Sequence, residues 1–198
     1  MKKRLPSLDN LTAEQVGKLF PIRIEPYNPD WTMLFEQEKV LIAKALSENI
    51  VLNIEHFGST SVVGLAAKPT IDVLVEIPNL DNEIKQIIIR KLETIGYMNM
   101  YNAEKDDKMT FGKGYDENYA CTQTYHIHIR KKGDTPQDEI YFRDYLRQNA
   151  DARDEYATLK YALAEKYQFN REGYTQAKTE FVIKITEQQK KKVHPANA

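Results

Sequence analysis

The clearest hydrophobic pattern in this chain is a pair of apolar runs joined by a loop of small and polar residues. The first run, Val51–Phe57, ends at Gly58 and predicts a short β-strand. The second run, Thr70–Ile77, is rich in β-branched residues and alternates with a period of two, so it predicts a second strand. Together the two runs predict a strand–loop–strand unit.

The second of these strands carries a carboxylate at its third position. Alternation places Asp72, Leu74 and Glu76 on one face of the strand and the branched apolar residues on the other. A carboxylate in an apolar strand is costly unless it is paired, hydrogen-bonded or bound to a metal. Asp72 is therefore the first candidate for a functional residue.

The residues before this unit show one short and one long helical pattern. Residues 11–18 predict a short helix capped by Asn10 or Thr12, and three prolines make 21–29 extended. Asp30 is predicted to cap a longer helix that reaches Leu46. Its buried stripe is expected to consist of Trp31, Leu34, Phe35, Leu41, Ile42, Ala45 and Leu46.

The residues after the unit predict a helix, further strands and a helical C-terminal segment. The first helix is expected at 80–95, with Gly96 as its C-cap glycine. The strands are expected at 97–101, 109–112 and 122–130, with polar turns at 102–108 and 113–118, and the last helices at 136–149, 151–167 and 173–189. This order predicts an α+β fold in which helices flank a mixed β-sheet. We expect a single domain over 1–198, with the sheet at about 20–132 and the C-terminal helices at about 135–190.

Composition narrows the class of protein. The formal net charge of -1 gives no general electrostatic argument for nucleic acid as a partner. No run approaches the roughly 18 apolar residues of a membrane span, and no signal peptide is evident. The single cysteine, Cys121, cannot form an internal disulfide and fits a reducing compartment. We expect a cytoplasmic protein, whose oligomeric state the sequence does not define.

The loop between the two strands has the composition of an anion-binding site. It contains Gly58, Ser59 and Thr60, then Gly64 and Lys68. Small residues let backbone N–H groups approach an anion, hydroxyls add donors, and a lysine adds charge. The alternative is a plain strand connection with Lys68 in solvent and Asp72 bonded to nearby amides. Residue types alone leave both interpretations open.

The same segment resembles a known family. Gly58-Ser59 followed by Asp72 in a strand is similar to the signature of the nucleotidyltransferase superfamily. The whole segment EHFGSTSVVGLAAKPTIDVLVEI resembles the GrpB family, a poorly characterised group within it. Four further pieces resemble that family in the same order, from about residue 11 to 184: IEPYNPDW at 24–31, YHIHI at 125–129, FRDYLR at 142–147 and YTQAK at 174–178. The resemblance implies a nucleotidyltransferase-like fold.

The resemblance also implies a divalent metal, with Mg²⁺ or Mn²⁺ favoured over Zn²⁺. The superfamily pattern uses two carboxylates two residues apart on the second strand. Asp72 fills the first position, but Leu74 stands at the second and cannot bind a metal. Glu76 shares the face but lies about 13 Å along the strand from Asp72, too far to share one ion. Ordinary two-metal chemistry is therefore in doubt.

Other residues could replace the missing carboxylate. His126 and His128 alternate onto one face of a predicted strand, and with Asp72 they would suit zinc, manganese or iron better than magnesium. They could instead bind phosphate or act as acid and base, or simply face solvent. Glu55 is a further candidate metal ligand. Glu55 and His56 point to opposite faces, and the sequence does not say which of them faces Asp72.

Several basic residues could hold phosphate. We single out Lys68, Lys113, Arg143, Lys160 and Lys178. Most helix-borne cations are only solvated, but Arg143 and Lys178 lie in segments that resemble the family. Tyr174 lies one helical turn before Lys178, so both can face one pocket.

These features give one leading functional hypothesis and two alternatives. The leading hypothesis is a protein that binds a nucleotide or another phosphorylated small molecule, with transfer of a nucleotidyl group as its reaction. Phosphate would lie at Gly58, Ser59, Thr60, Lys68, Arg143, Tyr174 and Lys178, and chemistry at Asp72, His126 and His128. The first alternative is a non-catalytic nucleotide- or protein-binding module, because the resemblance implies fusions to a coenzyme A biosynthetic kinase. The second is a metal-dependent phosphate-ester hydrolase.

Overall fold

The computed structural model describes residues 12–47, 49–100, 108–115, 123–133 and 137–193. The helices are α1 (Ala13–Leu19), α2 (Asp30–Leu46), a 3₁₀ turn η2 (Ser59–Ser61), α3 (Asn82–Thr94), α4 (Gln137–Gln148), α5 (Ala150–Lys166), α6 (Arg171–Ala177) and α7 (Thr179–Val193). The strands are β1 (Asn53–Phe57), β2 (Thr70–Ile77), β3 (Met98–Asn99), β4 (Lys108–Lys113) and β5 (Thr124–Lys131).

The five strands form one mixed sheet in the order β1-β2-β5-β4-β3. Strands β2 and β5 are parallel, and every other neighbouring pair is antiparallel. The expected α+β fold with a mixed sheet is therefore confirmed. The order also places β5, which is distant in sequence, directly beside the strand that carries Asp72.

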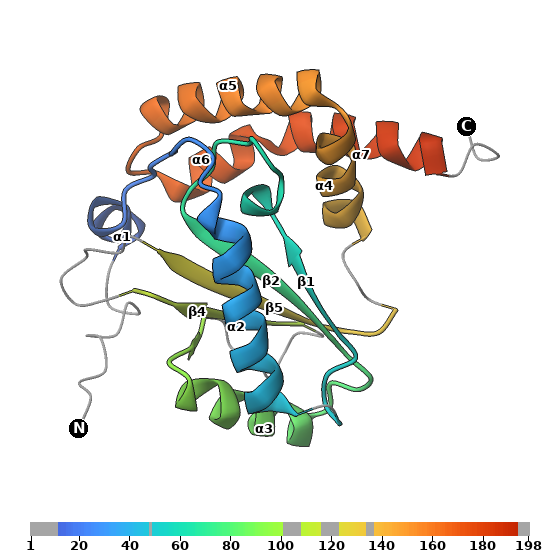
Figure 1. Ribbon diagram of the computed structural model, residues 1–198. Helices are drawn as coiled ribbons and strands as arrows, with labels where there is room; N and C mark the ends of the chain where they lie inside the picture. The colour runs from blue at the N-terminus through green and yellow to red at the C-terminus, as the bar shows by residue number, and fades with distance from the viewer. Residues whose placement is uncertain (1–11, 48, 101–107, 116–122, 134–136, 194–198) are drawn as a thin grey trace.

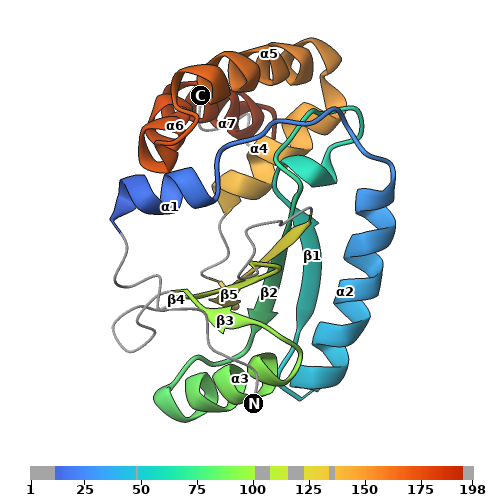
Figure 2. The same ribbon diagram turned by 90° about the vertical axis from the view of Figure 1, so that its left-hand side faces the viewer.

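The helices divide into two groups (Figures 1 and 2). Helices α2 and α3 cover one face of the sheet, and their apolar residues form the main core with the alternate branched residues of β2, β4 and β5. Helices α4 to α7 lie together at the end of the sheet where β1 ends and β2 begins. A second apolar cluster joins them to the loop after η2 through Val62 and Leu65.

The start of α2 differs from its prediction. Asp30 is the first helical residue, and the cap position is Pro29, whose ring offers no side-chain acceptor. The Asp30 N–H donates instead to Asn28 Oδ1 at 2.9 Å. For α1 the prediction of Thr12 is confirmed, because Thr12 and Gln15 form a reciprocal capping box.

The buried stripe of α2 also differs at one position. Leu41 is 43% exposed, and the inward position belongs to Glu38. Glu38 accepts two bonds from Lys113 Nζ, at 2.7 and 3.0 Å, so its charge is paired where it is buried. The helical period places residue 38, and not residue 41, on the buried face with Phe35 and Ile42. Position on the helix therefore decided which side chain is buried, although Leu41 is the more apolar of the two.

The predicted C-terminal helices are present, but the third is divided. The chain forms α6 and α7 in place of one helix over 173–189, with a break at Lys178, the C-cap of α6. Residues 102–107 of the turn expected at 102–108 lie outside the described residues, as does Cys121, and Lys108 begins β4. Among the residues that are described, no helix is long and apolar enough to cross a membrane.

Gly58, between β1 and η2, is required by close contact as well as by backbone conformation. Its φ is +73°, and a Cβ added there would lie 2.3 Å from Asp72 Oδ2. Gly96 has a similar φ of +91°, but an added Cβ would meet nothing within 4 Å. A side chain at position 96 would meet backbone strain alone, whereas a side chain at position 58 would meet both backbone strain and a steric clash with Asp72.

We expect Gly58→Ala to lower the free energy of unfolding by about 3 kcal/mol or more, and Gly96→Ala by about 1–2 kcal/mol. The difference arises because only the first substitution forces Asp72 to move. Urea unfolding of the two variants and the wild type measures both values. If both variants lost the same free energy of unfolding, the contact with Asp72 would not be a reason for glycine at position 58.

Candidate functional site

Strand register brings three predicted site residues together. Asp72 pairs with His126 and Leu74 with His128 in the parallel β2–β5 ladder. The two imidazoles therefore share the face of Asp72, at 3.5 Å from its Oδ1 for His126 Nδ1 and 3.7 Å for His128 Nε2. In the described part of the chain, these three residues form the group whose ligand atoms all lie within 4.8 Å of one another.

The spacing of these donor atoms fits a small divalent ion. Two ligands about 2.1 Å from one ion in tetrahedral geometry lie about 3.4 Å apart. His128 stands in register with Leu74, so an imidazole lies on the neighbouring strand beside the position where the superfamily pattern has a second carboxylate. A set of one carboxylate and two imidazoles suits Mn²⁺, Fe²⁺ or Zn²⁺.

Contacts around the group fix its orientation. The Tyr115 hydroxyl lies 2.5 Å from His126 Nε2, and their rings are stacked with centroids 5.9 Å apart. A bond from Nε2–H to the Tyr115 oxygen leaves Nδ1 free as a metal ligand. The ring of Phe57 meets that of His128 edge-on at 5.0 Å. Burial opposes ionisation of Asp72, but its contacts with both histidines outweigh that cost and lower its pKa.

The glycine-containing loop is held by its own hydrogen bonds. Ser61 Oγ donates to the Gly58 carbonyl at 2.7 Å. The Thr60 hydroxyl donates to the carbonyl of Thr70 at 2.9 Å and lies 3.0 Å from His56 Nε2. Thr60 is buried and its hydroxyl is turned toward the protein, unlike the phosphate contact expected from the sequence. Gly58 and Ser59, together with Val62 and Lys68 of the same loop, line a cavity.

The register of β1 against β2 shows which of Glu55 and His56 lies on the same face of the sheet as Asp72. Phe57 opposes Asp72 and Glu55 opposes Leu74, so Glu55 lies on the Asp72 face. His56 lies on the core face and stacks on Phe35 with centroids 4.6 Å apart. Burial, together with the nearby arginines, lowers the pKa of His56 to about 4, so it is neutral in the core.

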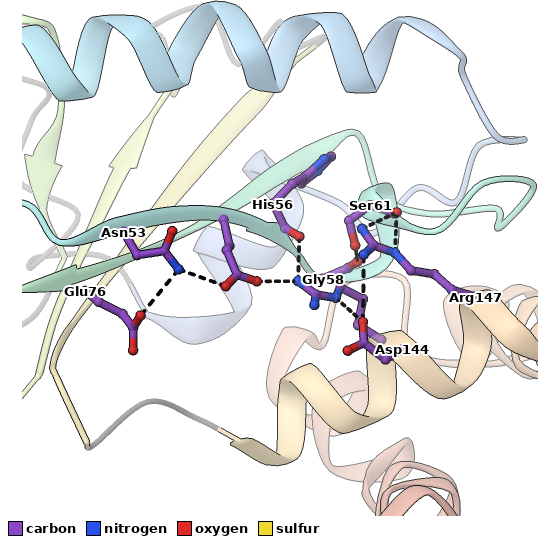
Figure 3. Close-up of polar contacts among 9 residues, drawn as sticks. Asn53, His56, Gly58, Ser61, Glu76, Asp144 and Arg147 are labelled. Atoms are coloured by element: carbon purple, nitrogen blue, oxygen red, sulfur yellow. Dashed lines mark hydrogen bonds and ion pairs between the residues drawn. The ribbon is translucent and has the colours of Figure 1, made fainter. Parts of the chain in front are cut away.

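Glu55 is held in an ion pair with Arg143. Figure 3 shows the surrounding network, with Asn53, His56, Ser61, Asp144 and Arg147 labelled. Arg143 Nη1 donates to Glu55 Oε2 at 2.9 Å and to the His56 carbonyl at 3.1 Å, and Nε donates to Asp144 at 2.7 Å. Arg143 thus ties α4 to β1. Arg147 extends the link by donating to the Ser61 carbonyl. The structure does not bring Glu55 into the group of Asp72, His126 and His128, where it was expected to act as a metal ligand.

A cavity of about 260 Å³ lies between the Gly58 loop, the start of β2 and the C-terminal helices. It collects seven of the site residues predicted from the sequence: Gly58, Ser59, Lys68, Asp72, Arg143, Tyr174 and Lys178. Its other lining residues include Tyr156 and Lys160. His126 and His128 reach this cavity through Asp72, which lies in its wall.

Three lysines, Lys68, Lys160 and Lys178, converge on the cavity, which the carboxylates of Asp72 and Glu139 also line. Burial, followed by repulsion from Arg171 and Lys178, lowers the pKa of Lys68 to about 8. Burial, followed by repulsion from Lys178 and Lys68, lowers the pKa of Lys160 to about 6. Lys160 is only 2% exposed, and its Nζ donates to the Ala66 carbonyl. The arrangement concentrates positive charge that an anion could neutralise.

Aromatic rings support these lysines. Lys178 Nζ lies 4.4 Å from the ring centroid of Tyr174, and Lys68 Nζ lies 5.6 Å from the same ring. Lys160 Nζ lies 4.6 Å from the Tyr156 centroid. The expectation that Tyr174 and Lys178 share one pocket is confirmed. Lys160 was named from the sequence only as a basic residue, since no local motif distinguishes a buried helical lysine from a solvated one.

Comparison with known proteins finds close relatives. The profile of the family described as "GrpB protein" matches residues 21–188. The "Glutamate-rich protein GrpB" of Alkalihalophilus pseudofirmus is 36% identical over 160 residues, which cover 80% of this chain and 90% of that protein. The crystal structure of the conserved protein GrpB from Enterococcus faecalis is 34% identical, with a TM-score of 0.74, and covers 86% of this chain and 99% of that chain.

Two more distant similarities concern larger proteins. A mutant of the Cid1 poly(U) polymerase bound to MgATP has a TM-score of 0.53 at 12% identity, covering 83% of this chain and 52% of that chain. At this identity the likeness concerns the fold alone, which is nucleotidyltransferase-like. The dephospho-CoA kinase of Mycobacterium tuberculosis is 26% identical over 178 residues, which cover 78% of this chain and 42% of the kinase.

We expect Lys160→Met to raise the free energy of unfolding most at or below about pH 6, and progressively less as the pH rises toward 10.5. Over that window the unfolded wild type holds a proton on Lys160 and the folded wild type does not, so wild-type stability rises with pH. The slope of the difference is at most about 1.4 kcal/mol per pH unit.

Urea unfolding at pH 6 and at about pH 9 measures this difference. The control is Lys166→Met, at an exposed lysine of the same helix, for which we expect a difference that does not change with pH. A Lys160→Met difference that is equally constant would contradict the lowered pKa.

Proposed function

This chain belongs to the GrpB family and has the nucleotidyltransferase fold, and on that basis we propose that it binds a nucleotide and transfers its nucleotidyl group with the help of a divalent ion. The observation that carries the proposal is the position of Asp72. Its carboxylate lies both in the wall of the basic cavity and within reach of the two histidines. A phosphate chain in the cavity would therefore end beside a metal site.

The cavity would hold the phosphates of the donor. Lys68 and Lys178 would supply charge, and Lys160, whose pKa is lowered to about 6, would take up a proton when an anion binds beside it. Gly58 and Ser59 line the same cavity, where their backbone N–H groups would add donors. Burial is the main cause of the lowered pKa values of Lys68 and Lys160, and repulsion among the cations adds to it, so an anionic ligand would offset the second of these causes. Arg143 contributes less charge to the ligand, because Glu55 and Asp144 already neutralise it.

Asp72, His126 and His128 would hold the divalent ion. When bound, such an ion polarises the phosphoryl oxygens and helps to orient the donor. The Cid1 structure was obtained with MgATP, whereas a donor set with two imidazoles favours softer ions than Mg²⁺. Mn²⁺ satisfies both considerations, so we propose Mn²⁺ as the ion to test first. Tyr115 keeps the ring of His126 in place for this role.

The proposed reaction is an in-line displacement at the α-phosphorus. An oxygen of the acceptor forms a bond to phosphorus while the bond from phosphorus to the bridging oxygen of the β-phosphate breaks. The pair of electrons leaves with pyrophosphate, and the proton of the acceptor passes to water. The lysines of the cavity stabilise the charge that develops on the leaving pyrophosphate.

Two observations support a binding module as the second candidate. Leu74 removes a carboxylate on which nucleotidyl transfer ordinarily depends, and part of a dephospho-CoA kinase is similar to this chain. In that case the cavity would bind a nucleotide or cofactor without turnover. The Asp72–His126–His128 group also leaves metal-dependent hydrolysis of a phosphate ester as a candidate.

We expect nucleoside triphosphates with Mn²⁺ to raise the melting temperature of the wild type, by roughly 5–10 °C at about 100 times Kd. In Asp72→Asn the metal-dependent part of this shift should be lost, because the amide cannot replace the carboxylate as an anionic ligand. Thermal denaturation with each nucleotide, with and without Mn²⁺, Mg²⁺ or Zn²⁺, measures both effects. Asp151→Asn, at an exposed position in the first turn of α5, should behave as the wild type.

Product analysis by ³¹P NMR then separates the candidates. Release of pyrophosphate supports transfer, and release of inorganic phosphate alone supports the hydrolase. Stabilisation without turnover supports the binding module. If no nucleotide stabilises the wild type with any of the three ions, the proposal of a nucleotide site is wrong.

A further inference from the structure

A second, smaller cavity lies on the other side of Lys68. Its volume is about 70 Å³, and it lies between the end of α1, the extended segment that follows it, and the first residues of β2 and β5. Figure 2 shows α1 beside α6 at this side of the molecule. The residues that give the cavity its chemistry are Arg23, Lys68, Thr70, Tyr115, Thr124 and Arg171.

The second cavity adjoins both parts of the site described above. Lys68 and Thr70 line the second cavity and the larger one, so they form the wall between them. Tyr115 lines the second cavity and contacts His126, one of the proposed metal ligands. The proposed metal site of Asp72, His126 and His128 therefore lies between the two cavities. Asp72 lines the larger cavity, and Tyr115, which contacts His126, lines the smaller one. This is the arrangement that a transfer between two ligands requires.

The charges in the second cavity favour an anion. Arg23, Lys68 and Arg171 contribute three cations, against one carboxylate from Glu25. Burial is the main cause of the lowered pKa of Lys68, and repulsion from Arg171 adds to it. The hydroxyls of Thr70 and Thr124, 2.8 Å apart, add polar groups at the sheet end of the cavity.

The size of the second cavity limits what can enter. A volume of about 70 Å³ corresponds to little more than two waters at about 30 Å³ each, far below the roughly 300 Å³ of a drug-sized pocket. A phosphate or carboxylate group fits such a space, whereas a nucleobase does not. The ligand must therefore be a small anion or the anionic end of a larger molecule.

We propose that the second cavity is an anion subsite that binds a phosphate or carboxylate group of the acceptor, an inference that rests on the proposed transfer function. The donor phosphates would lie in the larger cavity and the acceptor's anionic group in the smaller one. Lys68 would contact both. The acceptor is then an acidic or phosphorylated small molecule, and the site selects it by charge.

The test is a titration of the full chain with inorganic phosphate, and separately with acetate, followed by ¹⁵N–¹H NMR. Amides of Phe20, Arg23 and Tyr115 report the smaller cavity, and those of Gly58, Ser59 and Lys178 report the larger one. We expect both sets to shift with phosphate. A shift of the first set with acetate would identify a carboxylate acceptor, and a shift with phosphate alone would identify a phosphorylated one.

Four variants assign the shifts to the two cavities. Arg23→Ala, at an exposed arginine, should raise the dissociation constant of the first set by roughly two- to fivefold and leave the second set unchanged. Lys178→Ala should do the reverse, and Lys68→Gln should weaken both sets. Arg90→Ala, at an exposed arginine of α3 far from both cavities, is the control.

The two proposals fail in different ways. If the first set does not shift while the second saturates with phosphate, the acceptor subsite is wrong and the donor cavity stands. The subsite is also wrong if Arg23→Ala titrates like the wild type. If the second set fails to shift as well, the proposed function loses its phosphate cavity. Wild-type melting temperatures for the variants ensure that each loss reflects binding rather than unfolding.

Discussion

The carboxylate of Asp72 lies on an interior strand of the sheet, and the arrangement of the site follows from the need to compensate its charge. The parallel register of β2 and β5 supplies two imidazoles on the same face, and Gly58 lets the loop backbone approach the second carboxylate oxygen. A slip of one residue in that register would turn both histidines to the opposite face. The apolar residues that alternate with Asp72, all fully buried against α2 and α3, fix the register. The packing of the core therefore determines the geometry of the polar face.

The lysines around the cavity present the opposite problem, an excess of charge. Lys160 is almost fully buried and near two other cations, an arrangement that lowers stability. Cation–π contacts with Tyr156 and Tyr174 offset part of that cost but leave the repulsion among the lysines. Structural ion pairs elsewhere in the chain are matched, as Arg143 with Glu55 and Lys113 with Glu38 show. The cavity brings three lysines together with the carboxylates of Asp72 and Glu139, and this excess of basic side chains suits an anionic ligand.

The pattern of apolar and polar residues predicted those elements of the fold in which propensity and burial favour the same structure. Strand β2 has the predicted bounds, because β-branched alternation and burial on one face agree. The prediction that Asp72, His126 and His128 converge depended on which strands are neighbours, and period two fixed only the faces. Thr60 was assigned to phosphate, but its hydroxyl bonds the Thr70 carbonyl, a contact that the fold of the loop determines. The burial of Lys160 could not be foreseen, because its partner Ala66 is distant in the sequence. Glu38 was missed for the same reason, because its partner lies 75 residues away.

Leu74 is informative about how this site differs from the two-carboxylate pattern. It is 1% exposed, so a carboxylate at position 74 would have to be desolvated as well as ligated. His128, in register with Leu74 on β5, supplies an imidazole beside this position, and an imidazole does not place a second negative charge beside Asp72. The cost is a donor set with less negative charge, which would hold one ion of intermediate softness better than a pair of Mg²⁺ ions. If transfer occurs here, the lysines rather than a second metal must stabilise the leaving phosphates, and this accounts for three of them in one cavity.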